Sequence, residues 1–294
     1  MNDPLYIGIR FALYADLMLL FGLPLFALYT PEGRDSVAVQ RPILIGLAIV
    51  GMALSAAAIA AMTASMAGVP ILDVDRASIS AMISATPMGM AWAVRMGALA
   101  LLAIGLVALR RPAVIASFGA IALGSLAWTG HGAAGEGNAG TVQLIGDLLH
   151  LLSAGAWLGA LVGLSALLWA NSGQAETHRA LDRFASAGSV IVAAVVGSGL
   201  VNGFYIVGWS KLGSLLSTFY GQLLLLKLAL FAAMLGLAAT NRFRLTPALG
   251  KIGRDNADGA RRALRKSLML ETGAAIAILG LVAWLGTLAP PMSR

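Results

Sequence analysis

The chain has 294 residues, of which 59% are hydrophobic and only 11% are charged, and its mean hydropathy is +0.85. Soluble domains carry roughly twice this share of charge, so a soluble fold with one large buried core is excluded. The absence of cysteine also excludes disulfides, zinc–thiolate sites, iron–sulfur clusters and thiol nucleophiles.

Eight apolar stretches are long enough to cross a bilayer, which takes roughly 20 residues of helix. They are uniformly apolar, which favours helices over the alternating strands of a membrane barrel. We therefore predict an all-α polytopic membrane protein, a bundle of about eight transmembrane helices in a single integral membrane domain spanning 1–294. In chain order, the predicted helices are Leu5–Tyr29, Ile43–Ala67, Met88–Leu109, Ala113–Gly130, Val142–Ala170, Arg183–Tyr205, Ser217–Thr240 and Ser267–Leu288.

Charges and helix breakers lie between these stretches. We predict connectors at Pro31–Asp35, Arg110–Pro112, Gly132–Gly140 and Asn241–Lys266. The segment Asp73–Pro87 is too polar to span, so it is predicted to be a surface helix or loop. The N-terminus has no basic region before its first apolar stretch, which indicates a retained helix rather than a cleaved signal.

The distribution of lysine and arginine predicts the orientation. The connectors after the first, third, fifth and seventh helices hold fourteen of these residues, and the opposite side holds three, Arg76, Lys211 and Arg294. The positive-inside rule then places both termini outside, which in a bacterium is the periplasmic face of the inner membrane. The basic stretch 241–266 also has a second interpretation, as a site for anionic lipid or a partner.

Glycines repeat every four residues on two of the predicted helices. Gly155, Gly159 and Gly163 lie on the fifth, and Gly199 and Gly203 on the sixth. Faces of small residues let membrane helices approach closely, so these glycines are predicted to be packing positions.

Polar residues within the apolar stretches are costly in lipid and are functional candidates. Similar depth suggests two couples, Asp16 with Lys227 and Arg95 with Asp147, either as structural ion pairs or as parts of an ion path. The full set is Asp16, Arg95, Asp147, His150, Asn202, Lys227 and Glu271.

Two of the three histidines are predicted to lie at one depth near the outer face. His131 ends the fourth helix, and His150 follows on the fifth helix after a short connector. Asp147 precedes His150 by about one turn, as a metal ligand or as a carboxylate that orients the imidazole. A hydrogen bond between helices is the alternative role. His178, in the inner connector, is interpreted as a solvated residue.

Methionines gather at the same predicted face. Met62 and Met66 end the second helix, and Met88 and Met90 begin the third. Thioethers favour Cu(I), and imidazole suits copper in general, so these methionines and the two histidines form a candidate copper site. Packing is the alternative role for methionine. No phosphate-binding loop, serine–histidine–acid signature or nucleic-acid module is recognisable, so we predict no catalytic residues, no enzyme activity and no nucleic-acid partner.

Several motifs resemble the CopD (copper resistance D, also PcoD or YebZ) family of bacterial inner-membrane proteins, over the whole chain. The motifs are Leu20–Phe26, Gly130-His131-Gly132, Asp147-x-x-His150, Trp157-Leu158-Gly159, Tyr220–Leu228, Asn241–Pro247, Leu264–Ser267 with Glu271, and Leu285–Pro291.

The resemblance implies an eight-helix protein that takes copper across the membrane, with His131 and His150 as copper-side histidines and a periplasmic CopC-like copper-binding protein as partner. A histidine that some members carry in the first helix is absent, since that region reads Leu13-Tyr14-Ala15-Asp16. Two further interpretations stay open. The histidines could be axial ligands of haem in an electron-transfer protein, or the protein could pass copper to another protein without transporting it.

Overall fold

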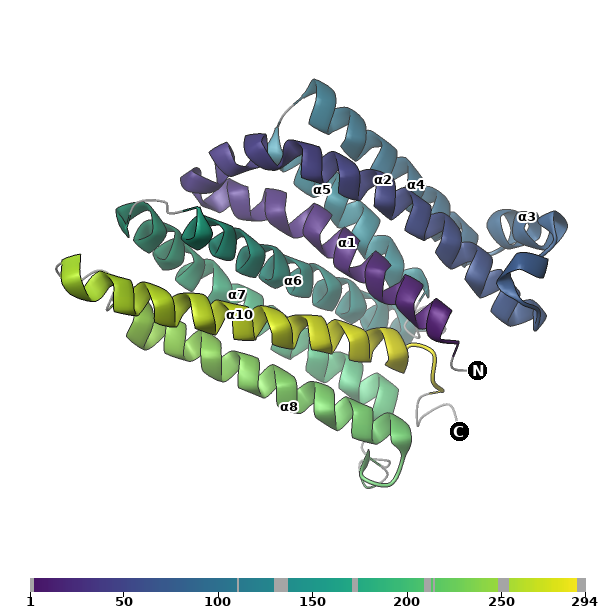
Figure 1. The fold of residues 1–294 in the computed structure, drawn as a ribbon. Helices are drawn as coiled ribbons and strands as arrows, with labels where there is room; N and C mark the ends of the chain where they lie inside the picture. The colour runs from purple at the N-terminus through teal and green to yellow at the C-terminus, as the bar shows by residue number, and fades with distance from the viewer. Residues whose placement is uncertain are drawn as a thin grey trace.

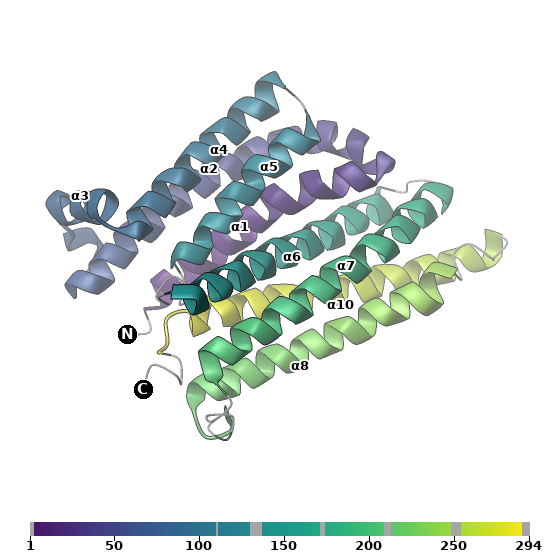
Figure 2. The same ribbon diagram turned by 180° about the vertical axis from the view of Figure 1, so that it is seen from behind.

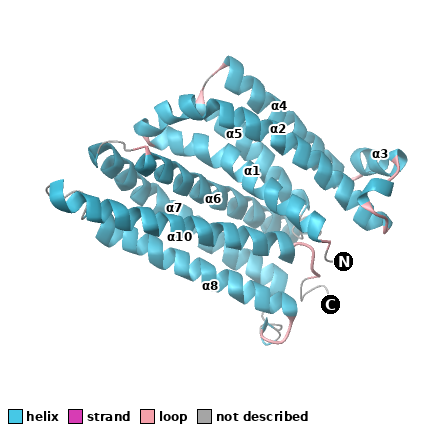
Figure 3. Ribbon diagram, viewed as in Figure 1, coloured by secondary structure: helices cyan, strands magenta, loops and turns pink. Residues whose placement is uncertain are grey.

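The computed structural model describes residues 3–109, 111–129, 137–170, 174–208, 213, 215–247 and 254–289. All regular structure in these ranges is helical (Figure 3). Within them, eight helices are long and apolar enough to cross a membrane. This confirms the predicted all-α fold with eight spans.

The spanning helices run alternately between the two ends of the bundle (Figure 1). Two of them continue into short helices of other types, the 3₁₀ helix η2 (Ser125–Thr129) and the π-helix η5 (Asn241–Leu245). The α-helices are α1 (Pro4–Tyr29), α2 (Pro31–Ala67), α4 (Pro87–Ala108), α5 (Pro112–Gly124), α6 (Gly137–Trp169), α7 (Gln174–Val207), α8 (Phe219–Thr240) and α10 (Arg254–Leu285).

Several helices extend beyond the apolar stretches that predicted them. α10 begins at Arg254, inside the predicted connector Asn241–Lys266, and α2 begins at Pro31 in another predicted connector. A helix satisfies its backbone hydrogen bonds internally, so it can continue past the hydrocarbon without an apolar sequence. The apolar pattern therefore located the spans but not the helix ends.

The polar segment after α2 forms short surface helices, as predicted. They are η1 (Ile71–Asp73) and the exposed α3 (Arg76–Ala85). Asp75 caps α3 by accepting a hydrogen bond from the Ser78 backbone N–H at 2.7 Å, and the Ser78 hydroxyl donates a second bond to it. These hydrogen bonds lower the pKa of Asp75, the backbone bond being the larger cause.

Both termini lie at one end of the bundle, where α3 also lies (Figure 1). We call this the terminal end, and the opposite end the basic end. An even number of spans requires the chain to begin and finish on the same side. The positive-inside rule predicts that the terminal end contacts the periplasm.

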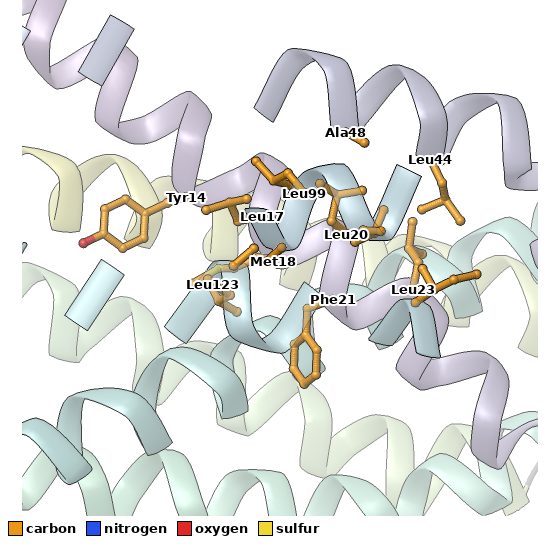
Figure 4. Close-up of a cluster of buried hydrophobic side chains, with 14 of the residues drawn as sticks. Tyr14, Leu17, Met18, Leu20, Phe21, Leu23, Leu44, Ala48, Leu99 and Leu123 are labelled. Atoms are coloured by element: carbon orange, nitrogen blue, oxygen red, sulfur yellow. The ribbon is translucent and has the colours of Figure 1, made fainter. Parts of the chain in front are cut away.

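α1 lies at the centre of the fold. It contacts α2 and α5 on one side and α6 and α10 on the other (Figures 1 and 2). Leu17 and Leu20 of α1 are fully buried together with Leu99 of α4 and Leu123 of α5 (Figure 4). The first helix is thus the core element on which the two halves of the bundle pack.

α1 and α6 approach each other backbone to backbone. A Cβ added at Gly22 would lie 2.8 Å from the Cα of Gly159, and one at Gly163 would lie 2.5 Å from the ring of Phe26. The predicted packing role of Gly159 and Gly163 is therefore confirmed. Gly203, on α7, has nothing within 4 Å of such a Cβ, so it is no close-contact position here.

Arginine side chains cap three of the helices that finish at the basic end, α1, α4 and α6. Arg183 donates to the carbonyl of Tyr29 at the end of α1, and Arg41 donates to that of Val107 near the end of α4. Arg261 and Arg265 both donate to the carbonyl of Leu168, 2.8 and 2.6 Å away, near the end of α6. Carbonyls at a helix C-terminus lack intrahelical partners and carry partial negative charge, so these cations stabilise the ends.

Candidate functional site

His150 of α6 faces α7. Its Nδ1 lies 3.1 Å from the Oγ of Ser198, and that hydroxyl donates its proton to the carbonyl of Ala194 at 2.5 Å. The ring also hydrogen-bonds the backbone of Val195. When Nδ1 carries the ring proton it donates to Ser198, and in that tautomer Nε2 keeps a lone pair that can bind a metal ion.

Three more polar side chains lie near this part of α6. Lys227 of α8 interacts electrostatically with His150 and with Asp147, one turn earlier on α6. Asn202 of α7 packs on Gly146, where a Cβ would lie 2.7 Å from its Oδ1. That Oδ1 is buried and accepts no hydrogen bond from a described group. We call Asp147, His150, Ser198, Asn202 and Lys227 the α6–α8 cluster.

The α6–α8 cluster offers a cation an imidazole nitrogen and carboxylate and amide oxygens. The charges of Asp147 and Lys227 cancel, so the cluster is neutral when the imidazole is neutral. Within the described part of the chain, no group of three or more histidine, cysteine, aspartate or glutamate side chains could hold a metal. A bound metal would therefore need ligands beyond Asp147 and His150. His131, the predicted second imidazole, lies outside the described residues.

Two of the four predicted methionines share a cavity at the terminal end. Met62 of α2 and Met88 of α4 line it, and its volume is about 30 Å³, enough for a water or a small ion. Met66 and Met90 are 63% and 71% exposed and do not line it. The structure thus brings together one methionine from each predicted pair.

The methionine cavity and His150 lie on different sides of the bundle. Leu148 of α6 points to α5, its Cδ2 lying 3.1 Å from a Cβ added at Gly124. His150, two residues later and about 200° further around the helix, points to α7. The described residues therefore form two separate sites rather than the single methionine and histidine site that the sequence predicted.

The ionic couples predicted from depth are wrong. Lys227 interacts with Asp147, not with Asp16. Asp16 packs instead on Gly51 of α2, and neither of its oxygens accepts a hydrogen bond from a described group. Arg95 donates a long hydrogen bond of 3.5 Å to the Oγ of Ser125. Depth gives the level of a residue along the bundle but not the direction in which it points, and the direction decided each pairing.

Glu271 lies toward the basic end, only 1% exposed, and accepts a hydrogen bond from Nδ2 of Asn241. This contact joins α10 to η5 at the end of α8. Asn241, from one motif of the family resemblance, therefore pairs with Glu271, from another.

We expect Glu271→Leu to destabilise the protein by about 1–3 kcal/mol, because the Asn241 amide would lose its buried acceptor. Glu271→Gln keeps an acceptor oxygen and should cost far less. Thermal unfolding in detergent, followed by circular dichroism, compares the two. Equal destabilisation by Gln and Leu would contradict this, since it would show that the negative charge is what matters.

Ser198 and Arg10 were not among the predicted site residues. Ser198 is an ordinary residue for a membrane helix, and only its register opposite His150 gives it a role. Arg10 lies six residues after the start of α1 and lines the methionine cavity. Its position in an otherwise apolar stretch was the available signal.

The fold and the α6–α8 cluster define a multi-pass helical membrane protein with ionisable groups held between its helices. Residues 1–141 match the family model described as "Copper resistance protein D-like, N-terminal domain", and residues 178–285 match "Copper resistance protein D". The chain belongs to the copper resistance protein D family, as its motifs indicated.

Three relatives are similar over most of this chain. Copper resistance protein D of Pseudomonas syringae pv. tomato is 44% identical over 99% of both chains. Copper transport protein CutJ of Bacillus subtilis is 32% identical over 81% of this chain but only 46% of its own length. Inner membrane protein YebZ of Escherichia coli is 28% identical over 97% of this chain and 98% of its own. No solved structure matches.

Proposed function

We propose that this protein moves copper ions across the bacterial inner membrane from the periplasm, with the α6–α8 cluster as its ion-binding site. The observation that carries the proposal is the position of His150, whose imidazole lies against Ser198 of α7 and interacts with Lys227, itself next to Asp147. The names of two relatives, a copper resistance protein and a copper transport protein, support copper as the ion.

In this proposal copper is the cargo, and it arrives at the terminal end, where a periplasmic CopC-like protein would deliver it. Met62 and Met88 are soft ligands for Cu(I) near that end. His150 and Asp147 bind the ion deeper in the bundle, and His131 is the further histidine that the family resemblance implies as a ligand. The ammonium of Lys227 repels the incoming copper ion, and the carboxylate of Asp147 offsets that repulsion. Asp16, buried in the middle of α1, is a further acidic residue predicted for the ion path.

The test measures bound copper and copper uptake by proteoliposomes for His150→Ala, His131→Ala and the double variant. His178→Ala is the matched control, because it removes the same side chain from the part of α7 near the basic end. We expect His150→Ala to bind and take up much less copper than the wild type. The double variant should show neither bound copper nor uptake, and His178→Ala should behave as the wild type.

Unchanged copper binding and uptake in the double variant would refute the proposal. A Soret band that disappears with the histidines would instead identify a haem protein. Specific copper binding in a protein whose vesicles take up no more copper than empty ones would identify a copper-transfer partner without transport activity.

A further inference from the structure

The methionine cavity at the terminal end is strongly positive. Besides Met62 and Met88, two arginines line it, Arg10 of α1 and Arg95 of α4. None of the described lining residues is acidic. Two guanidinium groups beside one small cavity repel each other and repel any cation that enters alone, all the more because the surroundings are of low dielectric.

Neither arginine has a carboxylate partner among the described residues. Arg95 is 3% exposed, its single hydrogen bond in that part of the chain is the 3.5 Å contact to Ser125, and its Nε has no partner. Arg10 makes a 3.5 Å contact to the hydroxyl of Tyr6, and its Nε likewise has no partner. Buried cations of this kind are normally paired, so the site lacks a negative charge.

The remaining groups around Arg10 hold it in place without neutralising it. Its guanidinium carbon lies 5.6 Å from the ring centre of Tyr6 and 5.8 Å from that of Tyr14, within the range of cation–π contacts. It also packs on Gly286, just after α10. Asp16, although only two residues after Tyr14, packs on Gly51 of α2 and does not line the cavity.

We infer that this cavity binds a small inorganic anion of the halide type between Arg10 and Arg95. The volume of about 30 Å³ suits an ion of this size. Arginine supplies fixed N–H donors that stay charged at all relevant pH values, which is the chemistry of an anion site. The anion would also neutralise the charge that otherwise keeps a cation from Met62 and Met88.

The inference is tested without copper, so its failure is separate from failure of the proposed function. Detergent-purified protein in sodium gluconate is titrated with chloride, and the ³⁵Cl NMR line width reports bound ion. We expect saturable broadening in the wild type that bromide reverses. Arg95→Gln should weaken chloride binding about tenfold or more, because it removes a charged donor.

Arg76→Gln is the matched control, since Arg76 is an exposed arginine at the start of α3 at the same end of the bundle. It should leave the titration unchanged. Arg10→Gln is the second variant, in case Arg95→Gln fails to fold as judged by circular dichroism. Broadening in the wild type that does not saturate, or that both glutamine variants at the cavity retain, would overturn the inference.

Discussion

Replacing Asp147 or Lys227 alone should destabilise the protein by roughly 3 kcal/mol, whereas replacing both should cost much less. Asp147→Asn removes the carboxylate that interacts with the Lys227 ammonium, and Lys227→Met removes the ammonium from beside that carboxylate. An uncompensated charge between membrane helices is the costly state, because neither lipid nor neighbouring apolar side chains can solvate it. The double variant removes both charges and with them most of this cost.

A double-mutant cycle measures the coupling. Unfolding of the wild type, both single variants and the double variant is followed by circular dichroism during thermal denaturation in detergent. The absence of cysteine makes thiol-reactive dyes unsuitable for this purpose. Strictly additive effects of the two substitutions would contradict the pairing of Asp147 with Lys227.

The same variants separate a structural role from ion binding. If the α6–α8 cluster binds copper, Lys227→Met should strengthen copper binding, because it removes a positive charge next to His150. Asp147→Asn and the double variant should weaken it, because both lack the carboxylate. Equal copper binding by all four proteins would show that the charge pair serves the fold alone.

The sequence was sufficient to predict the spans, because crossing a bilayer demands about 20 apolar residues and little else. It also predicted close packing at Gly159, since small residues four apart have few roles in a membrane helix besides close approach. Helix ends were less predictable. The basic residues that predicted a connector before α10 lie partly on the helix itself, and two of them, Arg261 and Arg265, bond to the end of α6.

The candidate sites could be predicted only in part, because hydropathy reports depth and not direction. Asp147 and His150 are one turn apart, so their common face followed from helical geometry. Their partners, Ser198 and Lys227, come from other helices and depend on how each helix is rotated in the bundle. The same limit explains why Asp16 and Lys227, similar in depth, do not meet.

Basic residues at one end of the bundle have two roles that a count of charges cannot separate. The positive-inside rule needs only their number. In the structure, four of them also bond to carbonyls at the ends of α1, α4 and α6. Three of the helices that finish at the basic end, α1, α4 and α6, are therefore capped by residues that also predict its location in the cytoplasm.

Gly159→Val should destabilise the protein by roughly 3 kcal/mol or more, because overpacking at this position forces backbones apart. The added side chain would meet the backbone of Gly22, which cannot rotate away as a side chain can. Since α1 also contacts α2, α5 and α10, its displacement disturbs both halves of the bundle. The effect should therefore be global.

Gly197→Val on α7 is the matched control, because it makes the same substitution in a spanning helix where nothing lies within 4 Å of the new Cβ. The two substitutions carry the same change in helix propensity and in hydrophobicity. A lower melting temperature and loss of the monodisperse peak in size-exclusion chromatography for Gly159→Val alone would then report the contact between α1 and α6. Similar behaviour of the two variants would show that α1 and α6 tolerate a wider spacing, and that the Gly22–Gly159 contact does not limit the packing of this bundle.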